Sequence, residues 1–168
     1  MSQIKVNSIV PVGGLPSGAT GGGIIQVVTT FKNDGFSTSS TSFVDITGFN
    51  VTITPQSNTS KILIMSCCSM NHDNASGMLR MNLLRGSTNI AEPSVSDSFS
   101  STHSSHFGSE TNGLFNWNYY FIDSPATTSA VTYKWQLANI TGTCKINGRA
   151  SGTNMASTGS VTAMELTN

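Results

Sequence analysis

The sequence predicts an all-β protein: an antiparallel jelly-roll β-sandwich that follows an extended N-terminal arm. Short segments rich in β-branched and aromatic residues recur along the chain, and turn residues such as Asn33-Asp34-Gly35 separate them. Roughly eight to ten short strands without a convincing helix are typical of a two-sheet sandwich or jelly roll. We therefore divide the 168 residues into an arm with a glycine-rich joint, residues 1–23, and a sandwich domain, residues 24–168.

The apolar segment 61–70 is expected to be the strand around which the sandwich is organised. In an extended chain Ile62 and Ile64 point to one side, and Leu63 and Met65 point to the other. Neither side is decisively polar, so the strand needs cover on both faces. In a chain this small, the second cover is expected from another copy of the protein. All four side chains are therefore candidates for a subunit interface.

The segment before this strand, residues 49–54, alternates apolar and polar residues, and residues 55–60 supply turn chemistry. We expect segments 49–54 and 61–70 to form a hairpin. Residues 92–113 are expected to form a surface excursion anchored by Val95 and Phe99. Spacing alone would allow a helix at 78–85, but the turn that follows favours a strand there. The remaining strands are expected at residues 24–32, 43–46, 89–91, 114–123, 130–139, 142–147 and 160–166.

Composition favours a structural protein. Charged residues make up only 10% of the chain and the formal net charge is zero, so nucleic-acid binding is not expected, because phosphate neutralisation needs clustered Lys and Arg. The three cysteines fit no zinc or redox spacing, and Cys67 and Cys68 would point to opposite faces of a strand. We expect small buried thiols. Neither a signal peptide nor an apolar run long enough for membrane insertion is evident.

The arm carries apolar residues that a purely solvated linker would not need, namely Ile4, Val6, Ile9 and Val10. Two prolines and six glycines follow within residues 11–23, a composition that forms neither a helix nor a central strand. A flexible linker or frayed terminus would explain the glycines. We favour an attachment arm on a glycine joint, with Ile4, Val6, Ile9 and Val10 contacting another protein.

Catalytic, cofactor and metal sites are not predicted. His103 and His106 are three apart, and on an extended chain they point to opposite sides, so they do not converge on one ion. No G-x-S-x-G motif occurs, and with eight acidic residues in the chain a carboxylate pair is uninformative. Polar loops are the better recognition candidates. The candidate receptor contacts are His72, Asn74, His103, His106 and Tyr120, the last because it falls off the aromatic stripe of its strand.

A set of short segments recurs through most of the chain in a distinctive order: Ile4-Lys5-Val6-Asn7 before the glycine joint, then residues 23–29, 43–48, 51–55, 60–64 and 158–166. These segments resemble tail-fibre-like virion proteins of tailed bacteriophages, particularly those of marine and cyanobacterial phages. The likeness implies a trimer of jelly rolls, similar to the tumour-necrosis-factor and complement globular-head architecture. It also implies that the N-terminal segment anchors to the particle, with assembly in the cytoplasm of the bacterial host.

The leading hypothesis is a non-enzymatic virion protein: a homotrimeric fibre or spike, attached by its arm to a tail, neck or capsid protein, that contacts the host surface, for example a glycan. Its trimer interface would include Ile62, Leu63, Ile64 and Met65. A capsid decoration or head-fibre protein is the second hypothesis. The third, from another class, is a carbohydrate-binding lectin or a glycan-active enzyme.

Overall fold

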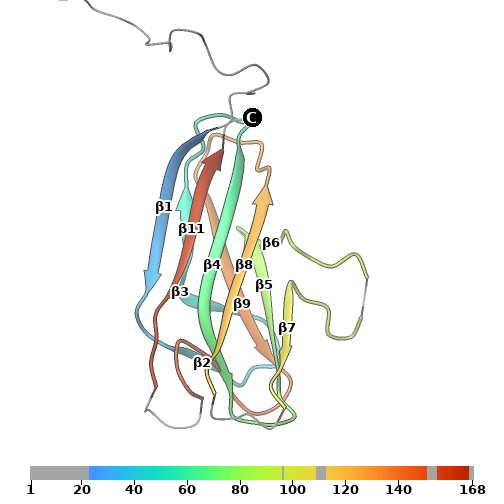
Figure 1. The fold of residues 1–168 in the computed structure, drawn as a ribbon. Helices are drawn as coiled ribbons and strands as arrows, with labels where there is room; N and C mark the ends of the chain where they lie inside the picture. Colours follow the sequence, from blue (N-terminus) through green and yellow to red (C-terminus); the bar gives the residue numbers. More distant parts are fainter. Residues whose placement is uncertain (1–22, 96, 109–112, 151–154, 167–168) are drawn as a thin grey trace, which may run out of the picture.

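The structure is a computed structural model that describes residues 23–95, 97–108, 113–150 and 155–166, and every regular element within them is a β-strand (Figure 1). The all-β prediction is therefore confirmed. In chain order the strands are β1 (Ile24–Lys32), β2 (Phe36–Thr38), β3 (Val44–Ile53), β4 (Lys61–His72), β5 (Met78–Arg85), β6 (Thr88–Asn89), β7 (His103–His106), β8 (Phe115–Asp123), β9 (Val131–Asn139), β10 (Cys144–Ile146) and β11 (Gly159–Leu166).

The strands form two antiparallel sheets that pack face to face. The first sheet has the order β1-β11-β4-β10-β2, with β8 paired to the other edge of β4. The second has the order β3-β9-β5-β6, with β7 paired to β5. Three short strands, β2, β6 and β10, stand outside the main pattern. The other eight strands pair from the two ends of the sequence toward its middle: β1 with β11, β3 with β9, β4 with β8, and β5 with β7. This nested pairing is the winding of a jelly roll.

Strand β4 is the central strand of its sheet, as the sequence predicts. It pairs with β8 along one edge, and with β11 and then β10 along the other. The predicted hairpin between segments 49–54 and 61–70 is wrong, because β3 pairs with β9 and lies in the opposite sheet. The turn residues between β3 and β4 reverse the chain across the sandwich instead of within one sheet.

The core is built from the inward faces of both sheets, where alternate residues of each strand meet. Trp135 of β9 is fully buried, and its indole packs edge-on against Trp117 of β8 with ring centroids 4.8 Å apart. Its Nε1–H donates a hydrogen bond of 2.8 Å to Ser66 Oγ on β4. The bond satisfies a polar group that would otherwise be costly in an apolar interior. The same inward stripe of β4 contains Ile62 and Ile64, both 0% exposed.

A charged network closes one end of this core. Asp123, 8% exposed at the end of β8, accepts two hydrogen bonds from Arg85 Nη1, at 3.0 and 2.8 Å. Tyr133 Oη donates a third, of 2.8 Å, to the same carboxylate. Burial, and then this hydrogen bond and the carboxylate charge, raise the pKa of Tyr133 well above its usual range. The phenol therefore stays protonated and keeps donating, which holds β5, β8 and β9 together.

Glu165 of β11 is a second buried acid, with 0% exposure. Its carboxylate accepts hydrogen bonds from Gln26 Nε2 at 2.6 Å and from the backbone N–H of Gln56 at 2.7 Å, which fixes the β3–β4 connection against the sheet. Burial by itself raises the pKa of Glu165, but the hydrogen bonds to the charged form outweigh it, and the net pKa is lowered.

Replacing Glu165 with Gln should therefore lower the free energy of unfolding by about 1–2 kcal/mol at pH 7, because an amide cannot accept all of these bonds. A lowered native pKa contributes stability that is present above the unfolded pKa, here 4.5, and is lost as pH falls through the native pKa. Urea unfolding of the native chain and Glu165→Gln at pH 7 and pH 3 should show the difference shrinking at pH 3. An equal difference at both pH values would contradict the role of the carboxylate charge.

The predicted surface excursion at residues 92–113 holds one regular strand, β7, within its described part. Val95 and Phe99 are not core anchors: Val95 is 72% exposed and Phe99 is 46% exposed. Phe99 instead lies against the guanidinium of Arg80, with 5.5 Å from Arg80 Cζ to the ring centroid. The excursion therefore rests on the second sheet and projects beyond it (Figure 1).

Candidate functional site

The candidate functional surface is the outward face of the first sheet. Because paired residues in a ladder share a face, the registers place outward side chains in rows across β1, β11, β4 and β8. The middle rows are Val27, Met164, Leu63 and Ile122, then Thr29, Thr162, Met65 and Tyr120, then Phe31, Ser160, Cys67 and Asn118. We call the outward side chains of these three rows the outer face.

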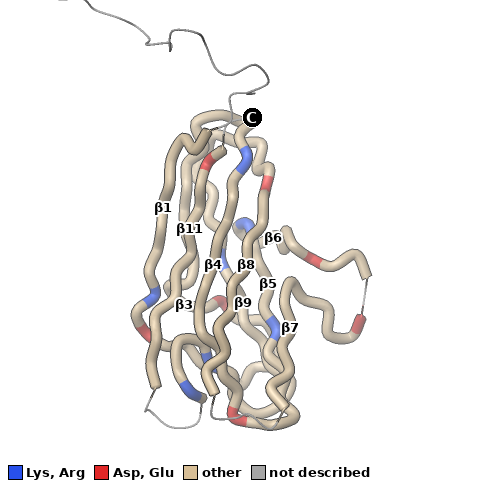
Figure 2. The backbone as a smooth tube through the Cα atoms, viewed as in Figure 1, with Lys and Arg blue, Asp and Glu red and all other residues tan. Residues whose placement is uncertain are grey.

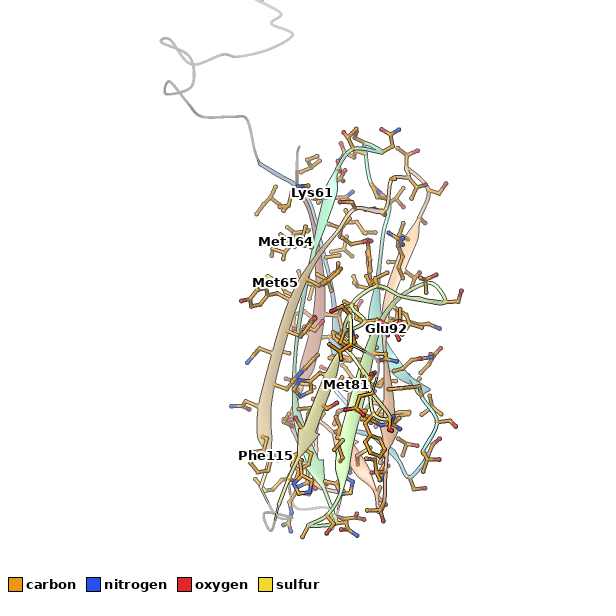
Figure 3. The ribbon with its side chains drawn as sticks, turned by 90° about the vertical axis from the view of Figure 1, so that its right-hand side faces the viewer. Lys61, Met65, Met81, Glu92, Phe115 and Met164 are labelled. Carbon is orange, nitrogen blue, oxygen red and sulfur yellow. The ribbon has the colours of Figure 1, made fainter. Side chains whose placement is uncertain are left out.

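The outer face exposes large apolar side chains. Phe31 is 71% exposed, Tyr120 77%, Ile122 55% and Met65 44%. In Figure 3 the labelled Met65 and Met164 lie on the side of the molecule that is turned away from the second sheet. Single exposed apolar residues are normal on a soluble protein, whereas contiguous apolar rows indicate an interaction surface.

Charge is missing from the outer face as well. None of its rows contains Asp, Glu, Lys or Arg, and the nearest outward charge along β4 is Lys61, one row beyond. Figure 2 shows the central lengths of β4, β8 and β11 without charged residues, and the charged positions on these strands lie near one end of the sheet. An uncharged apolar centre is the composition of the buried part of a protein–protein interface.

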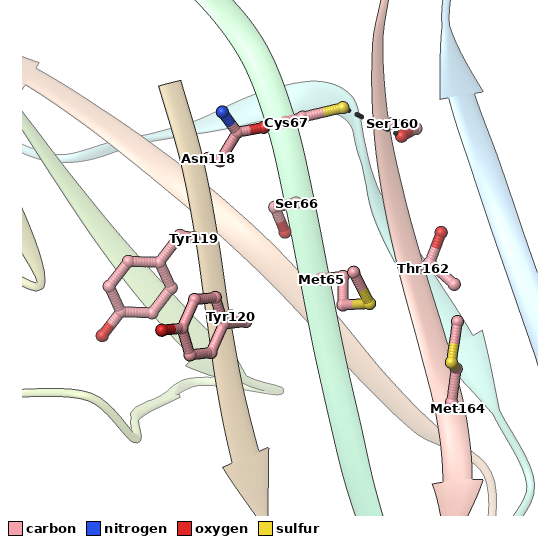
Figure 4. A pocket seen from close by; sticks show the side chains of 9 residues that line it. All are labelled: Met65, Ser66, Cys67, Asn118, Tyr119, Tyr120, Ser160, Thr162 and Met164. Carbon is pink, nitrogen blue, oxygen red and sulfur yellow. Dashed lines mark hydrogen bonds between the residues drawn. The ribbon is translucent and has the colours of Figure 1, made fainter. Parts of the chain in front are cut away.

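A depression of about 250 Å³ lies in the middle of the outer face (Figure 4). Side chains of three neighbouring strands line it: Tyr120 of β8, Met65 and Cys67 of β4, and Thr162 and Met164 of β11. The walls are mostly apolar, and each of the three strands also contributes a hydroxyl group. Such a depression suits an apolar or aromatic side chain better than a charged ligand.

Cys67 distinguishes the outer face chemically from the core. Its Sγ lies in the depression, 3.3 Å from Ser160 Oγ, and the residue is half-buried. Cys68 and Cys144 are buried, as predicted. Burial raises the pKa of Cys144 to about 12, and burial together with the neighbouring Cys67 raises the pKa of Cys68 still further. Within the folded subunit only Cys67 offers a thiol on the surface.

The four predicted interface residues divide between the two faces of β4. Leu63 and Met65 lie on the outer face, where another subunit could cover them. Ile62 and Ile64 are 0% exposed inside the core and have no surface left to bury, so their assignment to an interface is corrected. Alternation showed which residues share a face but not which face is the core. Val27, Phe31, Ile122 and Met164 were not among the residues predicted from the sequence. For Val27, Phe31 and Met164 the apolar residues on both faces of segments 24–32 and 160–166 were a usable signal.

His72 is not available as a receptor contact, which corrects that prediction. It is 0% exposed, with its Nε2 2.7 Å from Asn139 Oδ1. Its Nδ1 accepts a hydrogen bond of 3.0 Å from the backbone N–H of Asn74. Gly77 packs so closely on the ring that a Cβ there would lie 1.9 Å from His72 Cε1. His72 therefore joins the loops at this end of the sandwich.

The other receptor candidates lie apart from one another. His103 is half-buried on β7, its ring centroid is 5.7 Å from that of Trp117, and burial lowers its pKa. His106 is exposed on the same strand, and Asn74 is half-buried in the β4–β5 loop. Tyr120 belongs to the outer face. The structure thus does not bring these residues into one site.

The remaining predicted sites yield little. Ile4, Val6, Ile9 and Val10 lie outside the described residues. Among the residues that are described, no group of three or more His, Cys, Asp or Glu is placed to hold a metal ion. Within the same residues, no helix is long and apolar enough to span a membrane.

Comparison with solved structures gives matches of low similarity. The crystal structure of the infectious bursal disease virus VP2 subviral particle matches with a TM-score of 0.44 at 11% identity, over 84% of this chain and 40% of that chain. The structure of the Gt strain of that virus matches with a TM-score of 0.42 at 10% identity, with the same coverage. The chain therefore spans about two fifths of the matched chains. Neither is a phage tail fibre or a tumour-necrosis-factor-like head. The sequence matches no protein-family model and no curated protein.

Proposed function

We propose that the chain is a structural protein of a virus particle and assembles as a homotrimer through its outer face. The carrying observation is the set of uncharged rows across β1, β11, β4 and β8, centred on Leu63 and Met65. Leaving these side chains in water forgoes about 25 cal/mol for each Å² of apolar surface that an interface would cover. A second copy supplies a matching surface, because it carries the same uncharged rows.

The trimeric state is taken from the resemblance to phage proteins. The structure supports the subunit fold that this resemblance implies. The jelly-roll winding is present, and β4 carries apolar side chains on both faces. One face is used within the subunit, and the other is free. In this proposal Tyr120 is an interface residue and not a receptor contact, which leaves Asn74 on the β4–β5 loop and His106 on β7 to meet a host glycan.

The arm attaches the trimer to the particle. Ile4, Val6, Ile9 and Val10 supply apolar contacts to a tail, neck or capsid protein, and the glycine joint sets them apart from the sandwich. Repeated copies on one particle raise the avidity of weak host contacts by about 10²–10⁴-fold. No catalytic step is part of the proposed role.

Two measurements test the proposal. Sedimentation equilibrium of the full chain should give three times the subunit mass of 17.7 kDa. Cross-linking of residues 1–10 in purified particles of the virus that encodes the chain should capture a tail or neck protein. Capture of a capsid subunit would make it a head fibre or decoration protein. A monomer at all concentrations, or absence of the chain from purified particles, would contradict the proposal.

A further inference from the structure

Phe31 and the depression on the outer face form a knob and a hole on one surface. Phe31 lies on β1 opposite Ser160, a small residue that leaves the ring uncovered, and it is 71% exposed. The depression lies over β11, β4 and β8, and Phe31 is not among the residues that line it. The knob therefore stands on one edge strand of the sheet, and Tyr120 walls the hole on the other edge strand, β8.

Within one subunit, Phe31 is separated from Cys67 in the hole by strand β11. The register runs Phe31 to Ser160 and Ser160 to Cys67, so the two residues are two strand spacings apart, about 9–10 Å between backbones. Across a two-fold axis a knob and a hole of this kind would meet twice and close a dimer. In a trimer the contacts are head to tail, so the knob of each subunit meets the hole of the next, and three such contacts close the ring.

We propose that the hole on each subunit receives Phe31 of the next copy, and that this contact closes the ring. The inference rests on the proposed trimer and specifies which surfaces meet. Phe31 is favoured over the other exposed apolar side chains of the outer face because it is aromatic, has no polar group to satisfy, and does not itself form a wall of the hole. An aromatic anchor in an uncharged pocket is the usual centre of interface energy.

The native thiol in the hole allows a direct test. In the variant Phe31→Cys, the new thiol should form a disulfide with Cys67 of the neighbouring subunit under mild oxidation, giving covalent dimers and trimers on a non-reducing gel. A bond within one chain is excluded, because disulfides need Cα atoms within about 7 Å. Cys68 and Cys144 are buried and do not compete.

The double variant Phe31→Cys, Cys67→Ser is the matched control and should give no covalent product. Disulfides that persist in this control would join two copies of residue 31 and would overturn the head-to-tail contact. As a second readout, Phe31→Ala should raise the subunit concentration needed for assembly by about tenfold or more. Val95→Ala, a change at a residue 72% exposed on a distant loop, should leave it unchanged.

The outcomes separate this inference from the proposed function. A native chain that is trimeric, with no disulfide in Phe31→Cys and no change in Phe31→Ala, would overturn the Phe31 contact and leave the trimer standing. A native chain that is monomeric at every concentration would overturn both.

Discussion

Met65→Asp should produce folded monomers. Met65 lies in the middle of the outer face, is 44% exposed in the isolated subunit, and faces Tyr120 and Thr162 on the neighbouring strands. In the subunit an aspartate there remains in contact with water. In the trimer it would be buried without a partner, and burying an unpaired charge costs several kcal/mol. We expect assembly to be lost at every accessible concentration, with circular dichroism and the unfolding midpoint of the subunit little changed.

Val95→Asp is the matched control for this variant. It places the same charge at an exposed apolar residue on the loop beyond β6, away from the outer face. Sedimentation velocity should show trimers for Val95→Asp and monomers for Met65→Asp. Trimers in both would mean that the outer face is not the interface.

Ile64→Asp, one position earlier on β4, should have a different outcome. Ile64 is 0% exposed and packs in the core between the two sheets. An aspartate there has no counter-charge, so we expect a loss of more than about 4 kcal/mol in the free energy of unfolding. That is a large part of the stability of a domain of this size, and the chain should be unfolded or aggregated.

Ile64→Val is the control that shows how much stability is lost when the side chain at this position changes without gaining a charge. Removing one methyl group should cost only about 0.5–1.5 kcal/mol and leave assembly intact. Urea unfolding of both variants checks the comparison. A folded Ile64→Asp subunit that merely fails to assemble would place Ile64 at the interface and contradict the core assignment.

The sequence predicted the strands of this fold better than their partners. Residues 61–70 were expected to be the central strand, and β4 is central because it pairs along both edges, with β8 on one side and with β11 and β10 on the other. The hairpin with residues 49–54 was wrong because turn residues show that a chain reverses but not where its next strand pairs. In a jelly roll most partners are distant in sequence, as with β1 and β11. No local pattern records such a pairing.

The candidate site shows the same limit at the level of side chains. His72 looked like a loop residue because a polar stretch follows it, but Asn139, 67 residues away, supplies the partner that allows its burial. Phe31 looked like an ordinary strand residue, and only the register beside Ser160 shows that its ring is uncovered. Period-two alternation separates Leu63 and Met65 from Ile62 and Ile64, but it does not say which pair faces the second sheet.

The reactivity of the Cys67 thiol tests the central claim most directly. This thiol lies on the outer face, so its rate of reaction shows whether another subunit covers that face, and no mutation is needed. The full chain is treated with a thiol reagent over a range of concentrations while its mass is followed. We expect one thiol per chain to react quickly in dilute monomer and to become protected as trimers form, with the same concentration midpoint for both changes. A Cys67 that reacts equally fast in trimers and monomers would show that the outer face remains open to solvent.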